Sequence, residues 1–256
     1  MDTVDFRNWC TLGALVSIGS HHAGVIESFD DATGIATLAA ALPGAYADSG
    51  SLALIAHRLG KDGVAKFLSN KLPTKASARS GDMGEILATA YLHEEHGWVV
   101  GPSRLIQRDH QQWAMRGDDV LGAKLDTAGK AVIIKAEAKS RVTLAKDTVT
   151  EARNGLAREM EMPSAHSLTQ FAERLLSTAD AEVGEAVLML QLLDEVRANR
   201  VSHLMFLFTS NDPGKHVTAD LQAYTGAVAQ LTITLRVHGH KKFITDAYEL
   251  VVTDGA

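Results

Sequence analysis

The segment from Val132 to Arg141, VIIKAEAKSR, alternates between apolar and charged side chains, and this alternation is the strongest constraint on the fold. Side chains of a β-strand point to opposite faces with a period of two residues. As a strand, the segment has a small apolar face and a charged face, formed respectively by Val132, Ile134, Ala136 and Ala138, and by Lys135, Glu137, Lys139 and Arg141. The pattern therefore predicts a strand that is packed on one face and in contact with solvent on the other.

Glu137 and Lys139 lie on the same face of this strand, one position apart. A carboxylate and an ammonium group held in this way, near another acid, can bind a divalent metal and activate a water molecule. The simpler interpretation of an isolated E-x-K sequence is a half-exposed strand with a solvated face. The remainder of the chain has to decide between the two.

Composition excludes several classes of protein. The chain has 256 residues with 46% hydrophobic and 22% charged side chains, which suffices for a full core. The net charge of −6 means that any contact with nucleic acid needs a local basic patch or bound metal ions. The single cysteine, Cys10, excludes an internal disulfide and a zinc site built from several cysteines.

The same sequence indicates where the protein works. Its first residues lack the pattern of a secretory signal, and no segment offers the roughly 18 uninterrupted apolar residues of a membrane span. One thiol without a partner fits a reducing compartment. We therefore expect a cytoplasmic protein that does not contact a membrane.

Residues 1–79 are expected to form a mainly helical N-terminal extension, with helices near 31–42 and 48–72. Pro43 should end the first, and Gly60 and Gly63 should mark a joint in the second. Basic residues are in excess at the end of this region, namely Arg58, Lys61, Lys66, Lys71, Lys75 and Arg79 against the single acid Asp62. This excess indicates either a solvated helix face and linker or a surface that contacts phosphate groups.

A helix is expected from Ser80 to His96. Ser80 is a good N-cap residue, and Gly97 is a typical residue for the end of a helix. Apolar side chains recur at helical spacing and predict one buried face, formed by Met83, Ile86, Leu87 and Ala90. Glu85 lies at the margin of that face, where it is either an ordinary boundary residue or a carboxylate directed along the core.

Three strands are expected next, at 98–107, 113–125 and 131–141, and the short link between the last two predicts an antiparallel hairpin. Gly117 and Asp119 share one face of the second strand, whereas Asp118 faces the other way. Only one of the two acids can therefore accompany Glu137. We assign this role to Asp119, although the sequence leaves Asp118 as the alternative.

The remaining elements complete the pattern. Helices are expected at 148–161, from 167 onward, at 181–199 and at 218–230, and strands at 203–210, 231–239 and 247–253. The strand at 203–210, HLMFLFTS, is continuously apolar, which is typical of a central buried strand. The sequence contains no phosphate-binding loop motif, and we expect no small-molecule cofactor.

This order of elements, with Gly117-x-Asp119 followed by Glu137-x-Lys139, resembles the PD-(D/E)XK nuclease superfamily over residues 80–210. The resemblance implies an α/β (α+β) fold with a restriction-endonuclease-like core, in which helices flank a mixed central sheet. Residues 80–256 would form this nuclease-like domain. The chain departs from the usual pattern in one respect, because Asp118 stands where a proline would precede the acid.

Within that superfamily, the sequences S-G-D-x-G-E at 80–85, G-x-D and E-x-K are together similar to the HamA family. Members of this family are nuclease subunits of Hachiman anti-phage systems. The resemblance implies a DNA nuclease that acts with a helicase subunit as its protein partner. Other interpretations are a catalytically inactive nucleic-acid-binding or regulatory subunit with the same fold, and a stand-alone restriction-type endonuclease.

The chemistry of phosphodiester hydrolysis assigns a role to each candidate residue. Asp119 and Glu137, with Glu85 as a further ligand, offer hard oxygen atoms suited to Mg²⁺ or Mn²⁺. Lys139 would position the attacking water and offset negative charge. The remaining candidates are basic residues expected to contact DNA phosphates: Lys135, Arg141, Lys66, Lys71, Lys75 and Arg79.

Overall fold

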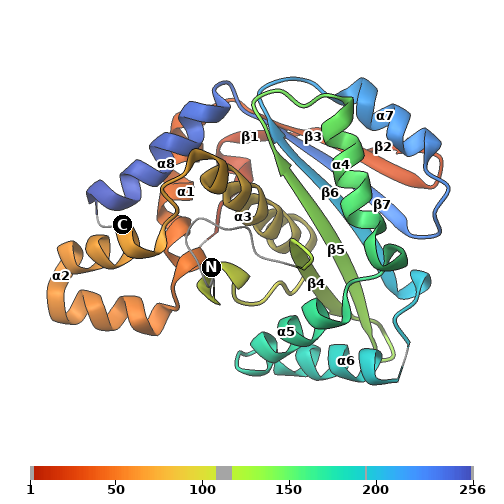
Figure 1. Cartoon of the computed structure of the whole chain (residues 1–256), viewed down its shortest axis with the longest axis horizontal. Helices are drawn as coiled ribbons and strands as arrows, with labels where there is room; N and C mark the ends of the chain where they lie inside the picture. The colour runs from red at the N-terminus through yellow and green to blue at the C-terminus, as the bar shows by residue number, and fades with distance from the viewer. Residues whose placement is uncertain (1–2, 108–116, 194, 255–256) are drawn as a thin grey trace.

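A curled, mixed seven-stranded sheet forms the centre of the molecule in the computed structural model, which describes residues 3–107, 117–193 and 195–254 (Figure 1). The strand order is β1-β3-β7-β6-β5-β4, with β2 paired to β3. The strands are β1 (Cys10–Leu12), β2 (Val16–Ile18), β3 (His21–Ser28), β4 (Val120–Leu125), β5 (Ala131–Ser140), β6 (Val201–Thr209) and β7 (Ala229–Arg236). This mixed sheet flanked by helices confirms the expected fold class.

The four central strands, β3, β7, β6 and β5, run parallel, and the sheet ends on antiparallel strands at both edges. Parallel strands joined by helical crossovers are covered on both faces, so their side chains are apolar on both sides. In β6, every residue is buried except Ser202, which is half-buried. This burial explains the continuous apolar run at 203–210.

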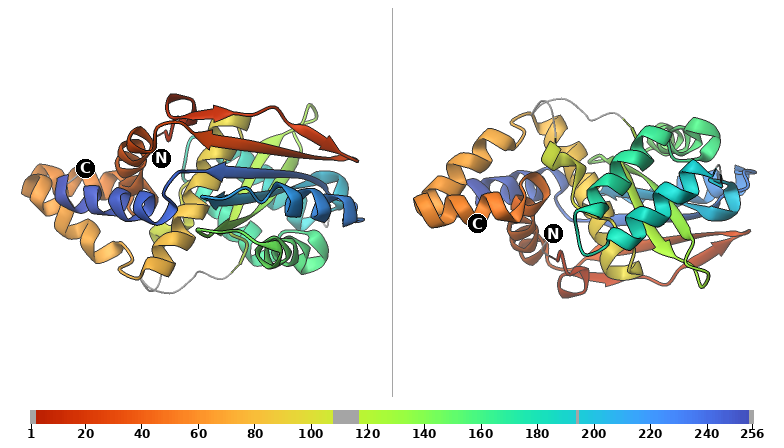
Figure 2. Two further views of the ribbon diagram at one scale, coloured as in Figure 1. Left: turned by 90° about the horizontal axis from the view of Figure 1, so that it is seen from above. Right: turned by 90° about the horizontal axis from the view of Figure 1, so that it is seen from below.

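Eight α-helices flank the sheet in the described part of the chain. They are α1 (Asp31–Tyr46), α2 (Ser49–Lys71), α3 (Ala76–His96), α4 (Lys146–Ala157), α5 (Ala165–Leu176), α6 (Ala181–Leu192), α7 (Gly214–Ala223) and α8 (His240–Asp254). Short 3₁₀ helices are η1 (Phe6–Asn8), η2 (Arg104–Gln107), η3 (Arg158–Glu161) and η4 (Ala198–Arg200). Figure 2 shows α1, α2 and α8 gathered at one end of the molecule, beyond the sheet.

The two faces of the sheet have separate cores. The largest apolar cluster joins α1, α3 and α8 to one face, where it includes Ile134 and Ala136 of β5. The opposite face carries two smaller clusters, one with α5 and α6 and one with α4 and α7. Consecutive residues of β5 therefore belong to different cores, as the period of two requires.

The N-terminal region contains the two expected helices, α1 and α2, but it also contributes strands to the sheet. Residues 10–28 form β1, β2 and β3, and β3 pairs with β7 in the central sheet. The prediction of a boundary at residue 79 stays a prediction, but this pairing joins residues on both sides of it. The first helix also continues through Pro43 to Tyr46, because a proline near a helix end removes only one N–H donor.

Two later predictions were also wrong. Residues 247–253 belong to helix α8 and not to a strand, and the buried residues Ala247, Tyr248 and Val251 lie on one helical face. In the segment 98–107 only Val99 makes a β-bridge, to Ala123, before η2 begins.

Other boundaries moved by a few residues. Helix α3 begins at Ala76, four residues before the expected cap Ser80, and it ends as expected at Gly97, whose φ is 60°. Strand β4 begins at Val120, so Asp118 and Asp119 precede it. The part of the expected strand at 113–116 lies outside the described residues.

No single helix in the described ranges is both long enough and apolar enough to cross a membrane. Among the helices described, α1 and α2 together reach that length and composition, and they are bent by 103° where they meet.

Candidate active site

The charged side chains of β5 share one face as expected, but Lys135 and Glu137 on that face are buried and not in contact with solvent. Lys135 is 1% exposed and Glu137 is 6% exposed. Helix α4 packs on this face, and Gly155 lies so close to the Glu137 carboxylate that a Cβ atom there would collide with it. A glycine at position 155 is therefore required for the Glu137 side chain to occupy its place.

Glu137 and Lys139 form an ion pair on this face, with Lys139 Nζ donating to Glu137 Oε1 at 2.6 Å. Burial raises the pKa of the Glu137 carboxyl, and the negative charge of Asp119 raises it further, while Lys139 acts in the opposite direction. Asp119 is thus close enough to Glu137 for their charges to repel. The Lys139 side chain keeps 20% of its exposure and so still reaches solvent.

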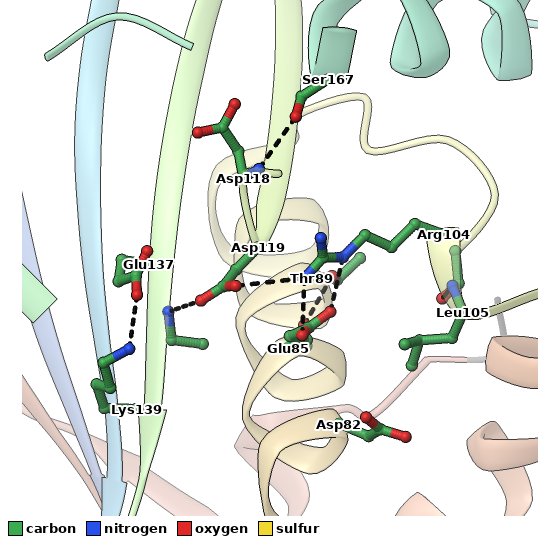
Figure 3. Close-up of polar contacts among 12 residues, drawn as sticks. Asp82, Glu85, Thr89, Arg104, Leu105, Asp118, Asp119, Glu137, Lys139 and Ser167 are labelled. Carbon is green, nitrogen blue, oxygen red and sulfur yellow. Dashed lines mark hydrogen bonds and ion pairs between the residues drawn. The ribbon is translucent and has the colours of Figure 1, made fainter. Parts of the chain in front are cut away.

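Asp119 occupies the point where the pairing of β4 with β5 stops. The last paired residues are Val120 and Ala136, and the Asp119 carboxylate accepts the next free amide, that of Ala138, at 3.0 Å (Figure 3). A buried backbone N–H needs a partner, and here a side chain supplies it in place of a backbone carbonyl. This hydrogen bond holds Asp119 beside the strand that carries Glu137.

Asp118 is directed elsewhere. Its carboxylate accepts the backbone N–H of Ser164 at 2.8 Å and lies 3.4 Å from Lys135 Nζ. Its own amide donates to the Ser167 hydroxyl at 3.0 Å. The two acids therefore point apart although both precede β4, and Asp119 is the one placed between Glu137 and Glu85 (Figure 3).

Glu85 pairs with Arg104, a residue that the sequence reasoning missed. Arg104 Nε and Nη2 donate to the two oxygens of Glu85 at 2.9 and 2.8 Å, and Nη2 also donates to Asp119 Oδ1 at 3.2 Å (Figure 3). The only available signal was that Arg104 is the single charged residue between Gly97 and Gln107.

Burial and charge act on this pair in opposite ways. Burial raises the pKa of Glu85 to about 7, which Arg104 opposes and Asp119 reinforces. Burial also works against the charge of Arg104, but Glu85 and Asp119 outweigh it and raise the pKa of the guanidinium group. Arg104 is therefore a permanent positive charge between two acids.

The three candidate carboxylates do not form one cluster. Glu85 comes from α3, which packs on the Ala138 face of β5, whereas Glu137 points to the opposite face, against Gly155 of α4. Among the described residues, no group of three histidine, cysteine, aspartate or glutamate side chains is placed to share a metal ion. The predicted three-carboxylate site is therefore not assembled, because Glu85 is engaged by Arg104.

Asp119 and Glu137 still fit a divalent cation. Mg²⁺ is commonly held by one or two carboxylates, and its other ligands are water and substrate phosphate oxygens. Burial raises the pKa of Glu137 and the charge of Asp119 raises it further, so a cation held by both carboxylates would offset their repulsion. These two residues, and not Glu85, are the candidate metal ligands in this geometry.

The structure contradicts the prediction that Lys135 contacts a phosphate group. Its ammonium group donates to the carbonyl oxygens of Arg158 at 3.1 Å and Met162 at 3.0 Å. Its side chain is 1% exposed, so no ligand in solution can reach it.

The other predicted DNA-contacting residues lie at the surface to different degrees. Arg141, Lys66 and Lys75 are exposed. Lys71 is half-buried and donates to the carbonyl of Ile106 at 3.3 Å. Arg79 is also half-buried; it donates to the carbonyl of Pro73 at 2.8 Å and lies over the ring of Tyr248.

A small hollow of about 40 Å³ adjoins the site. It is lined by Glu85, Arg104 and Asp119 and, from α5, by Ser167, Gln170 and Arg174. The Nε atom of Arg174 is buried and has no hydrogen-bond partner among the residues that the structure describes. Arg174 is a second cationic residue of this region that the sequence reasoning missed.

With this geometry established, comparison with known proteins identifies the family. The family model of HamA matches residues 4–251, which is nearly the whole chain. The chain belongs to the HamA family. This confirms the similarity to HamA inferred from the short motifs at 80–85, 117–119 and 137–139, whereas the wider PD-(D/E)XK resemblance stays a prediction.

A curated member of the family is also similar in sequence. Hachiman protein HamA from Bacillus cereus is 29% identical over 119 residues, which is 46% of this chain and 41% of that protein. The match thus spans less than half of the length of this HamA relative. Membership in the HamA family rests on the longer match of the family model, which includes Glu85, Asp119, Glu137 and Lys139 within its range.

Proposed function

We propose that this protein is a metal-dependent DNA nuclease of the PD-(D/E)XK type, which hydrolyses phosphodiester bonds as the effector of a Hachiman anti-phage system. The observation that carries the proposal is the grouping of Asp119, Glu137 and Lys139 where β4 stops pairing with β5. Two repelling carboxylates beside a lysine that reaches solvent form an arrangement suited to phosphate chemistry.

Asp119 and Glu137 would hold Mg²⁺ or Mn²⁺. When bound, the ion supplies a Lewis acid for the phosphate and lowers the pKa of a coordinated water. The protein positions the two ligands before the ion arrives, because Ala138 N–H holds Asp119 and Gly155 leaves space for Glu137. Such preorganisation avoids the cost of arranging the ligands during the reaction.

Lys139 serves the phosphate group in two ways. Its ammonium group keeps Glu137 oriented at 2.6 Å, and its partial exposure lets it face a phosphate that approaches the site. A fixed positive charge there stabilises the negative charge that develops on the phosphate oxygens. Lys139 would also position the attacking water or help to deprotonate it.

Local cations compensate for the acidic overall charge. The net charge of −6 opposes DNA, so contacts to the phosphate backbone must be local. Arg141 is exposed directly after β5, and Arg174 lines the hollow next to Asp119. These two residues support DNA as the substrate. Lys66 and Lys75 are exposed and add further positive charge elsewhere in the chain.

The role in defence and the helicase partner rest on the family alone. The curated relative is named for the Hachiman system, and it shares 29% identity over part of its length. We propose that a helicase subunit encoded beside this gene binds the protein. Co-purification of the two proteins from a co-expressing strain tests this, and elution as separate species would contradict it.

Cleavage assays test the proposed activity. We expect the protein, assayed with its helicase partner present, to cut DNA with Mg²⁺ and to stop when EDTA removes the metal. Glu137→Gln, Asp119→Asn and Lys139→Ala should each abolish cutting while circular dichroism shows an intact fold. The matched control is Lys130→Ala, which breaks the exposed Lys130–Glu195 ion pair on the hairpin, 2.9 Å in length, and should cut normally.

A second candidate function follows from the same ion pairs. Arg104 already pairs with Glu85 and Asp119, and Lys139 already pairs with Glu137, which also describes an inactive nucleic-acid-binding subunit. That protein would bind DNA without metal and would not cut it even with the helicase present. If wild type and the Glu137→Gln variant behave identically in the cleavage assay, the nuclease assignment is wrong.

A further inference from the structure

Arg104 occupies an unusual position for a positive charge in a site that is to receive a metal ion. Its guanidinium group forms a two-point fork with Glu85 and a third contact, at 3.2 Å, with Asp119. Only 12% of its side chain is exposed. Asp119 is also one of the two residues proposed to hold the metal. The Arg104 guanidinium group and the metal ion would therefore share one carboxylate.

Two cations cannot use the same carboxylate without cost. A guanidinium group within hydrogen-bonding distance of Asp119 repels a divalent ion that binds between Asp119 and Glu137, and low local polarity strengthens this repulsion. Arg104 also occupies lone pairs of Asp119 Oδ1, while Ala138 N–H occupies Oδ2. Both oxygens that would face the metal are therefore already engaged in hydrogen bonds.

The segment that carries Arg104 is attached less firmly than the strands that carry the ligands. It lies in η2, which follows a single β-bridge between Val99 and Ala123, whereas β4 and β5 pair along six residue pairs. A segment with few backbone hydrogen bonds opens at lower free energy than a paired strand. Asp119 also accepts the N–H of Ala138, so its position does not depend on Arg104 alone.

We propose that Arg104 is a built-in counter-cation that competes with the divalent metal for Asp119 and so keeps the site in a low-affinity state. The proposal rests on the proposed metal site at Asp119 and Glu137. Glu85 acts in it as a positioning residue, because its two oxygens hold the Arg104 fork in place. The carboxylate that was expected to be a third ligand thus has the opposite effect and anchors the competitor of the metal.

Mn²⁺ binding measured by calorimetry on the full chain, without DNA, tests this inference. Arg104→Gln should bind Mn²⁺ at least about tenfold more tightly than wild type, because it removes the competing charge and frees Asp119. Arg104→Lys keeps a positive charge and should stay near wild type. Asp119→Asn should abolish binding in every background, which shows that the measured ion occupies this site.

Arg174→Gln is the matched control. It removes the same charge from the same hollow, but within the described part of the chain Arg174 forms no ion pair with Asp119 and its Nε lacks a hydrogen-bond partner. The expected gain in Mn²⁺ affinity is below about threefold. An equal gain in both variants would show that general charge, and not the contact with Asp119, sets the affinity, and would overturn the proposal.

Removing Arg104 leaves Glu85 buried without its partner, which can destabilise the fold. A double variant that avoids this buried charge is therefore measured as well. Glu85→Gln/Arg104→Gln replaces the ion pair with two neutral amides, and it should bind Mn²⁺ more tightly than Glu85→Gln alone. The inference is overturned if Mn²⁺ binding is unchanged or weaker both in Arg104→Gln and in Glu85→Gln/Arg104→Gln, each compared with its own reference. If those variants gain affinity but no DNA is cut with Mg²⁺, the nuclease proposal fails and the competition for Asp119 stands.

Discussion

Lys135 and Lys139 lie four residues apart on the same face of β5, yet they have different environments. Lys135 is 1% exposed and donates to two backbone carbonyls, whereas Lys139 is 20% exposed and donates to Glu137. The difference arises from what covers the strand. The 3₁₀ helix η3 and the residue after it close over Lys135, and nothing comparable in the described residues covers Lys139.

The cover over Lys135 is a strained backbone. Three consecutive residues, Glu159, Met160 and Glu161, have positive φ values of 54°, 53° and 71°. Such a conformation costs about 1–3 kcal/mol per residue and persists only where its surroundings enforce it. The carbonyls of Arg158 and Met162 accept from Lys135, and that of Glu161 bonds His203 at 2.8 Å. One end of the face is thus buried under η3, whereas the other end, at Lys139, reaches solvent.

The largest expected effect separates the two lysines by activity. Lys139→Met should lower the rate of DNA cleavage by about 100- to 10,000-fold, because it removes the charge that faces the phosphate. Its free energy of unfolding should fall by less than that of Lys135→Met, because the Lys139 side chain reaches solvent whereas the Lys135 side chain is 1% exposed. Single-turnover cleavage and urea unfolding measure the two quantities, and a loss of stability without loss of cleavage would contradict the comparison.

Lys135→Met should show the reverse pattern. It leaves Asp118 buried without its partner and should lower the free energy of unfolding by about 3 kcal/mol. Cleavage per folded molecule should remain near wild type. The double variant Lys135→Met/Asp118→Asn is the control, because removing both charges should restore part of the stability. Equal losses in the single and double variants would show that the ion pair is not the cause.

The covered end should contribute its own loss of stability at low pH. Burial lowers the pKa of His203 to about 4, partly opposed by its hydrogen bond to Glu161, and Lys135 lowers it further. Below pH 6.5 His203 therefore binds a proton in the unfolded chain but not in the folded chain, so the free energy of unfolding falls as the pH drops towards 4. This loss amounts to up to about 3 kcal/mol.

His203→Gln isolates that contribution. The variant keeps a donor for the Glu161 carbonyl but cannot take up the proton. Urea unfolding at pH 7 and pH 4.5 should show a smaller loss of stability in the variant than in wild type. Glu85 and Glu137, whose pKa values are raised, have the opposite dependence in both proteins and cancel from the difference. Identical losses would mean that His203 is protonated in the folded chain.

The smallest expected effect concerns DNA affinity. Arg141 is exposed beyond the end of β5, so Arg141→Ala should weaken DNA binding by about two- to fivefold and reduce its salt dependence by about one phosphate contact. Lys135→Met should leave both unchanged. Arg197→Ala, at an exposed position before β6, is the control. Fluorescence anisotropy over a salt series measures this, and equal weakening by all three variants would indicate nonspecific attraction.

Local patterns in the sequence predicted the elements with a strong period. The alternation at 132–141, the continuous run at 203–210 and the helical stripe of α3 all appear in the structure, as β5, β6 and the buried face of α3. The failures were weakly patterned segments. Residues 247–253 have strand-forming side chains but belong to a helix, because packing against α1 and α2 outweighs a weak local preference.

The sequence by itself determined that Glu137 and Lys139 share one face, because the period of a strand relates alternate side chains directly. Only the tertiary structure decided that α4 and η3 cover this face, that Glu85 lies on the opposite side of β5, and that Arg104 stands between Glu85 and Asp119. These relations depend on which distant segments pack over each face of the sheet. Periodicity determines which face a side chain points to, but it carries no information about the residues that contact the side chain on that face.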